Sequence, residues 1–153
     1  MEVNRLSASI SSLKILWANQ NIPIKSSSEK EIKRVEMLKK IKLPNDLKFF
    51  YSEVNGMNGN YPDDMDDNGF LFYPVQHVLP YNKEFNSNNL DMNAVYIFAE
   101  YLHKSWWYAF KNGSDSNTYR IMVIFSKDDF RFISNSLAEF IELYLCDSPA
   151  LYK

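Results

Sequence analysis

The sequence predicts an α+β domain in which helices come first, strands follow, and one helix closes the chain. Three observations support this prediction. Apolar residues recur at three- and four-residue steps between residues 3 and 54, which is typical of amphipathic helices. From residue 95 to residue 133 they alternate with period two, which is typical of half-buried strands. Aromatic residues, which favour sheet positions, make up 16% of the chain.

From these patterns we expect one mostly antiparallel sheet of about four to six strands. N-terminal helices and one C-terminal helix should flank it. The 153 residues fit a single domain, and no linker or internal repeat divides residues 1–153.

Three helices are expected before residue 56. Ser28 and Glu31 form a capping box that opens the second helix. The pair Leu43-Pro44 separates the second helix from the third, because proline disfavours the helical conformation in the residue before it. Gly56 ends the third helix, since glycine readily adopts the left-handed conformation. The apolar residues assigned to buried faces are Val3, Leu6, Ile10, Leu13, Leu16 and Trp17, then Ile32, Val35, Leu38 and Ile41, then Leu47, Phe50, Tyr51 and Val54.

The strands are expected after a polar loop that ends at Gly69. A second polar loop is expected over residues 81–93, and a turn over residues 111–118. The last four strands have short connections, so an antiparallel meander is expected. The expected strands are Phe70–Tyr73, a short piece at His77–Leu79, Val95–Tyr101, Trp106–Phe110, Tyr119–Phe125 and Phe130–Ile133.

A closing amphipathic helix is expected to lie on the sheet. Ser136 and Glu139 form a second capping box at its start. Its apolar residues follow the helical period, so they should share one face. They are Leu137, Phe140, Ile141, Tyr144 and Leu145.

Composition argues against several classes of partner. A net charge of −2 and a pI of about 5.7 disfavour nucleic-acid binding, which depends on lysine and arginine. The basic run Lys39, Lys40 and Lys42 is expected to be a solvated helix face. One cysteine cannot form an internal disulfide, and no stretch approaches the roughly 18 apolar residues of a membrane span. The N-terminus lacks the apolar core of a secretory signal. We therefore expect a cytoplasmic protein with no nucleic-acid and no membrane partner.

An acidic loop between residues 63 and 69 is the most unusual feature of the chain. Four carboxylates within five residues repel one another, so the cluster is expected to have a use. A calcium-binding loop would place a bidentate glutamate where this chain has Val75. The other interpretations are a solvated loop and a patch that faces a basic partner, such as the cleft of a nuclease. The aspartates are Asp63, Asp64, Asp66 and Asp67.

A second candidate surface lies at residues 100–108 and includes Glu100. Trp106 and Trp107 are adjacent in an expected strand, so their side chains should point to opposite faces of the sheet. One can belong to the core. The other needs a covering helix or lies on the surface, where aromatic side chains often anchor interfaces. The alternative is that both are buried between sheet and helices.

No catalytic, cofactor-binding or metal-binding set is predicted. His77 and His103 lack the ligand spacing of a zinc site. Cys146, expected in the last turn of the closing helix, has no base near it in sequence. The four glycines form no phosphate-binding loop, and no serine nucleophile elbow is present. We therefore expect a protein without enzymatic activity and without a cofactor.

The order of these motifs resembles that of the SUKH superfamily, the Smi/Knr type of domain. The resemblance covers residues 28–146 and rests on the order and spacing of its segments. A Leu-Pro pair opens an aromatic amphipathic helix with an Asn-Gly stop, and two aromatic strands and a final helix follow. These segments are Leu43–Tyr51, Asn55-Gly56, Val95–Ala99, Trp107–Phe110 and Ser136–Ile141.

The resemblance implies one sheet flanked by helices and a role in protein binding. Most bacterial members of this superfamily are immunity proteins of polymorphic or contact-dependent toxin systems. They bind a cognate toxin, often a nuclease, and block it. We therefore expect a single SUKH-like domain that neutralises such a toxin by stoichiometric occlusion. The expected partner-binding residues are Asp63, Asp64, Asp66, Asp67, Glu100, Trp106 and Trp107.

Two other hypotheses remain open at the level of sequence. The first is a regulatory or scaffold domain of the same fold that binds a protein other than a toxin. The second is an enzyme or metal-dependent binder that uses His77, His103 and the aspartates.

Overall fold

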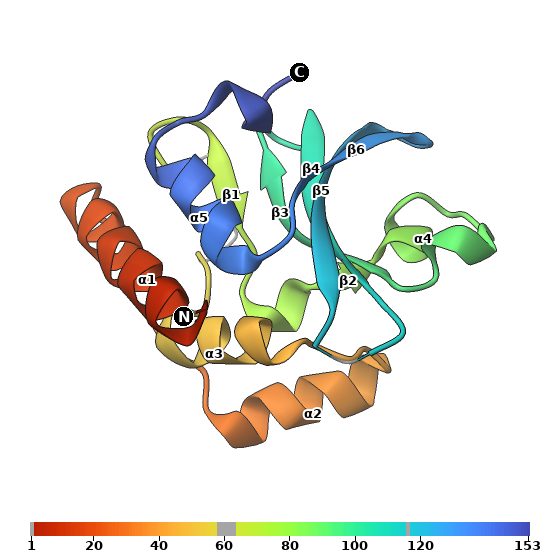
Figure 1. Cartoon of the computed structure of the whole chain (residues 1–153), viewed down its shortest axis with the longest axis horizontal. Helices are drawn as coiled ribbons and strands as arrows, with labels where there is room; N and C mark the ends of the chain where they lie inside the picture. Colours follow the sequence, from red (N-terminus) through yellow and green to blue (C-terminus); the bar gives the residue numbers. More distant parts are fainter. Residues whose placement is uncertain (1, 58–63, 116) are drawn as a thin grey trace.

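A computed structural model describes residues 2–57, 64–115 and 117–153 (Figure 1). The order of its elements is α+β, with helices first, strands next and a helix last, as predicted. The helices are α1 (Glu2–Asn19), α2 (Glu29–Lys39), α3 (Asn45–Glu53), the short α4 (Tyr81–Glu84) and α5 (Leu137–Leu145). The strands are β1 (Phe70–Phe72), β2 (Leu79–Pro80), β3 (Val95–Tyr101), β4 (Trp106–Asn112), β5 (Tyr119–Ser126) and β6 (Asp129–Ser134). Short 3-10 turns are η1 (Val75–His77), η2 (Leu90–Met92) and η3 (Pro149–Leu151).

The helix boundaries follow from local chemistry. The Ser28 hydroxyl accepts the Glu31 backbone N–H at 3.1 Å, and the Ser136 hydroxyl accepts that of Glu139 at 3.1 Å. Each bond satisfies an N–H group that the first turn of a helix leaves without a partner. Lys40, with a φ of 55°, ends α2 in the left-handed conformation. Both predicted N-cap serines therefore begin helices where the sequence places them.

The six strands form one sheet in which every pairing is antiparallel. Its order is β1-β3-β4-β5-β6. The short strand β2 also pairs with β3, on the same edge of β3 as β1. The predicted meander from β3 to β6 is confirmed. Across the ladder, Phe70 lies opposite Tyr101, and Tyr101 lies opposite Trp106. The start of β1, the end of β3 and the start of β4 therefore meet at one end of the sheet.

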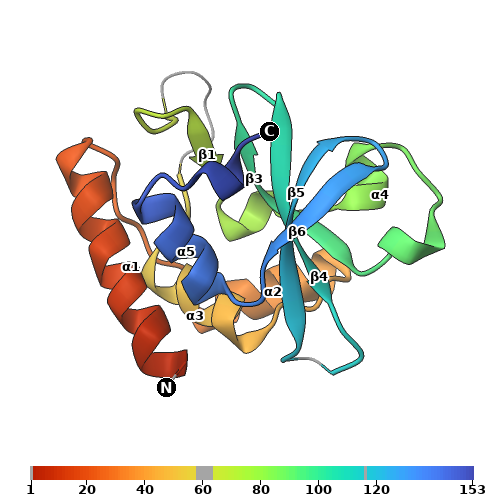
Figure 2. The same ribbon diagram turned by 45° about the horizontal axis from the view of Figure 1, so that its top comes forward.

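Helices cover both faces of this sheet. In Figures 1 and 2, α5 lies against one face and α1 packs along the outer side of α5, whereas α4 lies on the other side of the sheet. Helices α2 and α3 pack on each other at the end of the sheet away from the C-terminus. In the part of the chain that the structure describes, no helix is long and apolar enough to cross a bilayer.

The core between α5 and the sheet is strongly aromatic. The ring of Phe72 in β1 packs on Trp17 of α1 at 5.2 Å and on Tyr144 of α5 at 4.9 Å. Phe98 of β3 packs on Phe140 of α5 at 5.3 Å. Such pairs contribute about 0.5–1.5 kcal/mol beyond the area that they bury. They join helices from both ends of the chain to strands β1 and β3.

One predicted core residue is wrong: Leu38 is 66% exposed. Helix α2 packs through Ile32 and Val35, which are buried, and through Lys39. The Lys39 ammonium donates to the carbonyls of Gln76 and Val78 around η1. This contact sets the rotation of the helix and turns Leu38 towards solvent.

One strand prediction and one loop prediction also need correction. The piece expected as a strand at residues 77–79 is the end of η1 followed by the two-residue strand β2. The polar region 81–93, expected to be a loop, contains α4 and η2. Tyr81 and Met92 are buried there, so two apolar anchors hold a segment whose average composition is polar.

Candidate functional site

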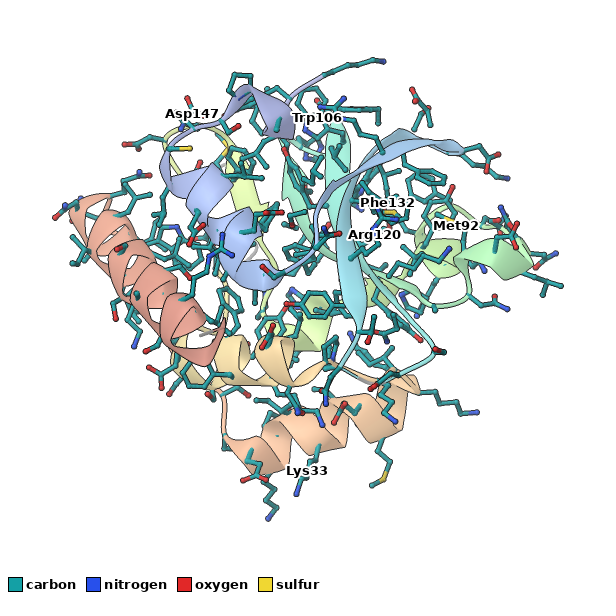
Figure 3. The ribbon with its side chains drawn as sticks, viewed as in Figure 1. Lys33, Met92, Trp106, Arg120, Phe132 and Asp147 are labelled. Carbon is teal, nitrogen blue, oxygen red and sulfur yellow. The ribbon has the colours of Figure 1, made fainter. Side chains whose placement is uncertain are left out.

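The predicted site residues come from distant segments and gather at the end of the sheet where β1 begins and β3 turns into β4. Figure 3 shows Trp106 and Asp147 at this end. We define the sheet-end surface as residues 64, 65, 67 and 68, residues 102–105, Trp106 and Asp147. Asp63, the first of the predicted aspartates, lies outside the residues that the structure describes.

Asp66 lies in the core, since its exposed fraction is 3%. Its Oδ1 accepts the backbone N–H groups of Asn68 and Phe70, both at 2.9 Å. Its Oδ2 accepts the hydroxyl of Tyr144, and that hydroxyl accepts the indole N–H of Trp17 at 3.0 Å. Burial raises the pKa of Asp66, and these hydrogen bonds oppose the rise. The carboxylate thus holds the acidic loop against α1 and α5 and does not reach the surface.

The neighbouring aspartates have different surroundings. Asp67 is exposed, and its backbone N–H donates to Gln20 Oε1 at 2.7 Å. Asp64 is half-buried. The internal bonds of Asp66 and the link from Gln20 fix the loop, so Asp67 points its carboxylate away from the core. The loop therefore presents Asp64 and Asp67 to solvent, while the calcium-loop interpretation would need Asp66 to turn outward with them.

A strained turn connects β3 to β4 beside this loop. Leu102, His103 and Lys104 have φ values of 44°, 52° and 62°. Residues with a side chain adopt this left-handed region at a cost of about 1–2 kcal/mol each. The Leu102 N–H donates to the Gly69 carbonyl at 2.9 Å, and the Ser105 N–H donates to the Tyr101 carbonyl at 2.9 Å. Strain of this kind is typical of functional segments.

The loop and the turn fit closely against each other. A side chain at position 69 would place its Cβ 2.6 Å from Leu102 Cδ2, so the Leu102 side chain would have to move. Gly69 also has a φ of 97°, which glycine tolerates best. Leu102 remains partly exposed at the tip of the turn. The candidate surface expected at residues 100–108 includes this turn, but its left-handed backbone was not predicted, because residues 102–105 include no glycine, asparagine or proline that would signal it.

The two tryptophans lie on opposite faces of the sheet, as predicted. Trp106 stacks on Tyr101 at 4.6 Å, and its indole N–H donates to the hydroxyl of Tyr108 at 2.9 Å. Trp107 packs on Phe85, directly after α4, at 4.7 Å. Both are half-buried, so each leaves part of its ring at the surface. Trp106 belongs to the sheet-end surface, and Trp107 lies next to Glu100 on the other face, because these two residues are paired in the ladder.

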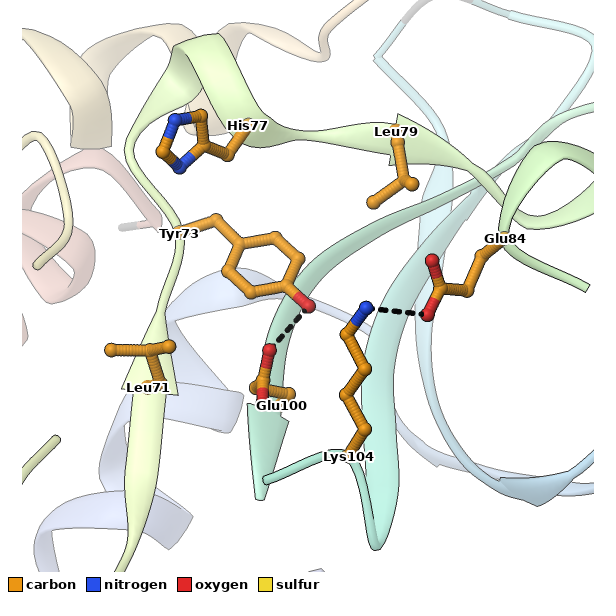
Figure 4. Close-up of a pocket in the computed structure, with 7 residues that line it drawn as sticks. All are labelled: Leu71, Tyr73, His77, Leu79, Glu84, Glu100 and Lys104. Atoms are coloured by element: carbon orange, nitrogen blue, oxygen red, sulfur yellow. Dashed lines mark hydrogen bonds and ion pairs between the residues drawn. The ribbon is translucent and has the colours of Figure 1, made fainter. Parts of the chain in front are cut away.

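Glu100 lies in a hollow of about 280 Å³ on that second face (Figure 4). Its exposed fraction is 5%, and its Oε1 accepts the hydroxyl of Tyr73 at 2.8 Å. At the mouth, Lys104 of the strained turn forms an ion pair with Glu84 at 3.2 Å. Burial and the adjacent carboxylate of Glu100 raise the pKa of Tyr73, so it remains a proton donor. The lining residues are Leu71, Tyr73, His77, Leu79, Glu84, Glu100 and Lys104.

The remaining chemical candidates are dispersed. His77 lines the hollow from η1, whereas His103 lies on the turn. Cys146 is exposed at the end of α5. Across residues 2–57, 64–115 and 117–153, no three histidine, cysteine or carboxylate side chains gather into a potential metal site. The groups presented together at this end are carboxylates, aromatic edges and an apolar turn, which suit contact with another protein.

Fold and surface thus define a small α+β protein that presents carboxylates, aromatic side chains and an apolar turn at one end of its sheet. The profile of the SMI1/KNR4 family (SUKH-1) matches residues 26–143, which is most of the chain. The chain belongs to this family. Proteins of the SUKH family are commonly immunity proteins of polymorphic toxin systems and are generally not catalytic. No curated protein matches the chain closely enough to count as a relative.

The matched range includes α2, α3 and the whole sheet, whereas α1 lies before it. Helix α1 packs along α5 and supplies Trp17 to the Asp66 network. This chain therefore uses a helix outside the matched family region to hold the acidic loop.

Proposed function

We propose that this chain is a cytoplasmic immunity protein without enzymatic activity. It binds a cognate bacterial toxin, a nuclease domain of a polymorphic or contact-dependent system, and blocks it by stoichiometric occlusion. The observation that carries the proposal is the family match over residues 26–143, because this family commonly supplies immunity proteins.

Charge supports the sheet-end surface as the contact. A nuclease cleft is basic because it binds phosphates. Asp67 is exposed on this surface, Asp64 lies three residues before it, and Asp147 is exposed at the end of α5. Opposite charges across an interface raise the association rate and disfavour wrong partners. Asp63 precedes these residues in the chain and keeps its predicted role.

Apolar groups on the same surface supply anchors. Leu102 projects from the turn, and Trp106 exposes part of its ring. Partly exposed aromatic side chains held by well-packed neighbours are frequent hot spots of interfaces. Trp106 is preorganised by Tyr101 and Tyr108, so it would lose little conformational entropy on binding. Asp66 contributes by positioning the loop from within.

A charge-reversal pair with a matched control tests the proposal. The Asp64→Lys/Asp67→Lys variant should lose toxin binding by at least about tenfold, because each lysine repels a basic cleft. The Asp91→Lys/Asp115→Lys variant carries the same change in net charge on exposed residues elsewhere. Both are titrated calorimetrically against the product of the neighbouring toxin gene and assayed for protection of cells that express it.

The outcomes separate the family assignment from the surface. Wild-type protein that neither binds nor protects against the neighbouring gene product would overturn the proposed function. Wild-type protection that both variants retain, or lose equally, would place the toxin contact elsewhere. Circular dichroism of each variant checks that the fold survives.

A further inference from the structure

We infer that the hollow around Glu100 receives a lysine or arginine side chain of the partner protein. The inference rests on the proposed function and specifies the chemistry of one contact. It starts from a carboxylate that the fold buries without a cation.

Glu100 is the first part of the argument. Its exposed fraction is 5%, yet no ion pair joins it to a lysine, arginine or histidine among the described residues. The Tyr73 hydroxyl donates to one of its oxygens, but a hydroxyl supplies no charge. A buried carboxylate is costly unless it is paired and hydrogen-bonded. An incoming cation would supply the missing positive charge.

Glu84 and Lys104 are the second part. The Glu84 side chain is 15% exposed, and Lys104 reaches it from the strained turn. The lining therefore combines two carboxylates with a single ammonium, an excess of one negative formal charge. The Lys104 side chain is 50% exposed, so it can turn into solvent when another cation enters. Lys104 thus marks where a cation sits and is itself replaceable.

The shape of the hollow is the third part. Leu71 and Leu79 line it, and apolar walls suit the methylene stem that lysine and arginine bury beside a charged end. Figure 4 shows the ends of Tyr73, Glu100, Lys104 and Glu84 facing a common space. Lys104 belongs to the turn of the sheet-end surface, so a partner docked there can extend one side chain into the hollow.

The test uses a small probe in place of the unidentified partner. N-acetyl-arginine methylamide is titrated into the ¹⁵N-labelled full chain, with N-acetyl-citrulline methylamide as the uncharged isostere. The arginine probe should shift amide resonances of residues lining the hollow in a saturable manner at millimolar concentration. The citrulline probe should shift them at least about tenfold less effectively, since it lacks the charge that the carboxylates recognise.

Four variants make the test directional. Glu100→Gln and Glu84→Gln should weaken arginine binding, whereas Lys104→Ala should strengthen it severalfold by removing the competing ammonium. Glu142→Gln, which removes a carboxylate paired with Arg5 on the other side of the molecule, should leave it unchanged. If Glu100→Gln does not fold, the opposite effects of Glu84→Gln and Lys104→Ala still decide the result. Equal shifts from both probes, or weaker binding by Lys104→Ala, would overturn the inference.

The same variants titrated with the toxin distinguish this inference from the proposed function. If the wild type binds the toxin and Glu84→Gln weakens that binding by about tenfold, the hollow receives a side chain of the toxin. If the wild type binds the toxin and neither Glu84→Gln nor Lys104→Ala changes the affinity, the inference fails while the proposed function stands. If the wild type does not bind the toxin, the proposed function fails and the partner-based inference fails with it.

Discussion

Replacing Tyr144 with phenylalanine removes one hydroxyl that serves two buried groups. This hydroxyl donates to Asp66 and accepts the indole N–H of Trp17 at 3.0 Å. The exposed fractions of Trp17 and Asp66 are 0% and 3%. Water therefore cannot replace the lost partner at either group without opening the packing between α1, α5 and the acidic loop.

The magnitude follows from these two contacts. A buried polar group left without a partner costs about 1–3 kcal/mol. Trp17 loses its hydrogen-bond acceptor, whereas Asp66 keeps two backbone donors and so loses less. We expect Tyr144→Phe to reduce the free energy of unfolding by about 2–4 kcal/mol. A domain of ordinary stability, about 5–15 kcal/mol, still folds after such a loss.

Urea unfolding followed by fluorescence measures this loss, and Tyr152→Phe is the matched control. The Tyr152 hydroxyl also donates to an aspartate, Asp147, but that aspartate is exposed and water can replace the bond. We expect the control to lose less than about 1 kcal/mol. Equal losses in the two variants, at unchanged dependence on urea, would refute the view that Asp66 anchors the loop.

Three further predictions concern stability. Burial places the pKa of Asp66 in the folded protein above its ordinary value of 3.8. Asp66 therefore contributes most to the free energy of unfolding below pH 3.8, and this contribution declines as the pH rises through the folded pKa. In urea unfolding, the free energy of unfolding of Asp66→Asn should therefore fall further below that of the wild type in acid than at neutral pH. Gly56→Ala should cost about 2–4 kcal/mol in thermal unfolding, because Gly56 has a φ of 64° and a Cβ there would lie 2.4 Å from the Tyr73 carbonyl oxygen. Gly113→Ala, where the nearest atoms are 3.2 Å away, should cost clearly less. Lys40→Gly should increase the free energy of unfolding by about 0.5–1 kcal/mol and so raise the thermal midpoint, since Lys40 ends α2 in the left-handed conformation and is exposed; a lower midpoint would contradict this.

Local signals predicted much of this fold. The capping pairs at Ser28 and Ser136 involve residues three positions apart, so their hydrogen bonds are determined by the segment itself. The alternation in β3 to β6 likewise predicted the meander, because side chains on successive residues of a strand face opposite ways. This rule placed Trp106 and Trp107 on opposite faces, as the structure confirms.

Burial of individual residues depended on contacts between distant segments. Leu38 has the helical spacing of a core residue, but Lys39 sets the rotation of α2 through carbonyls around η1. Asp66 and Asp67 are neighbours in one acidic run, yet the hydroxyl of Tyr144, 78 residues further on, draws only Asp66 inside. No periodicity within the loop distinguishes them.

The sequence by itself determined the α+β class, the family and the meander of the last four strands, because these depend on patterns within short segments. The pairing of β1 and β2 with β3 was not predicted. Only the tertiary structure decided which carboxylates face solvent and which are enclosed. It also assembled the hollow from residues between Leu71 and Lys104 and brought the acidic loop against the β3–β4 turn. The physical reason is that each surface is built from segments distant in the sequence. Strand pairing and packing across the whole core bring these segments together.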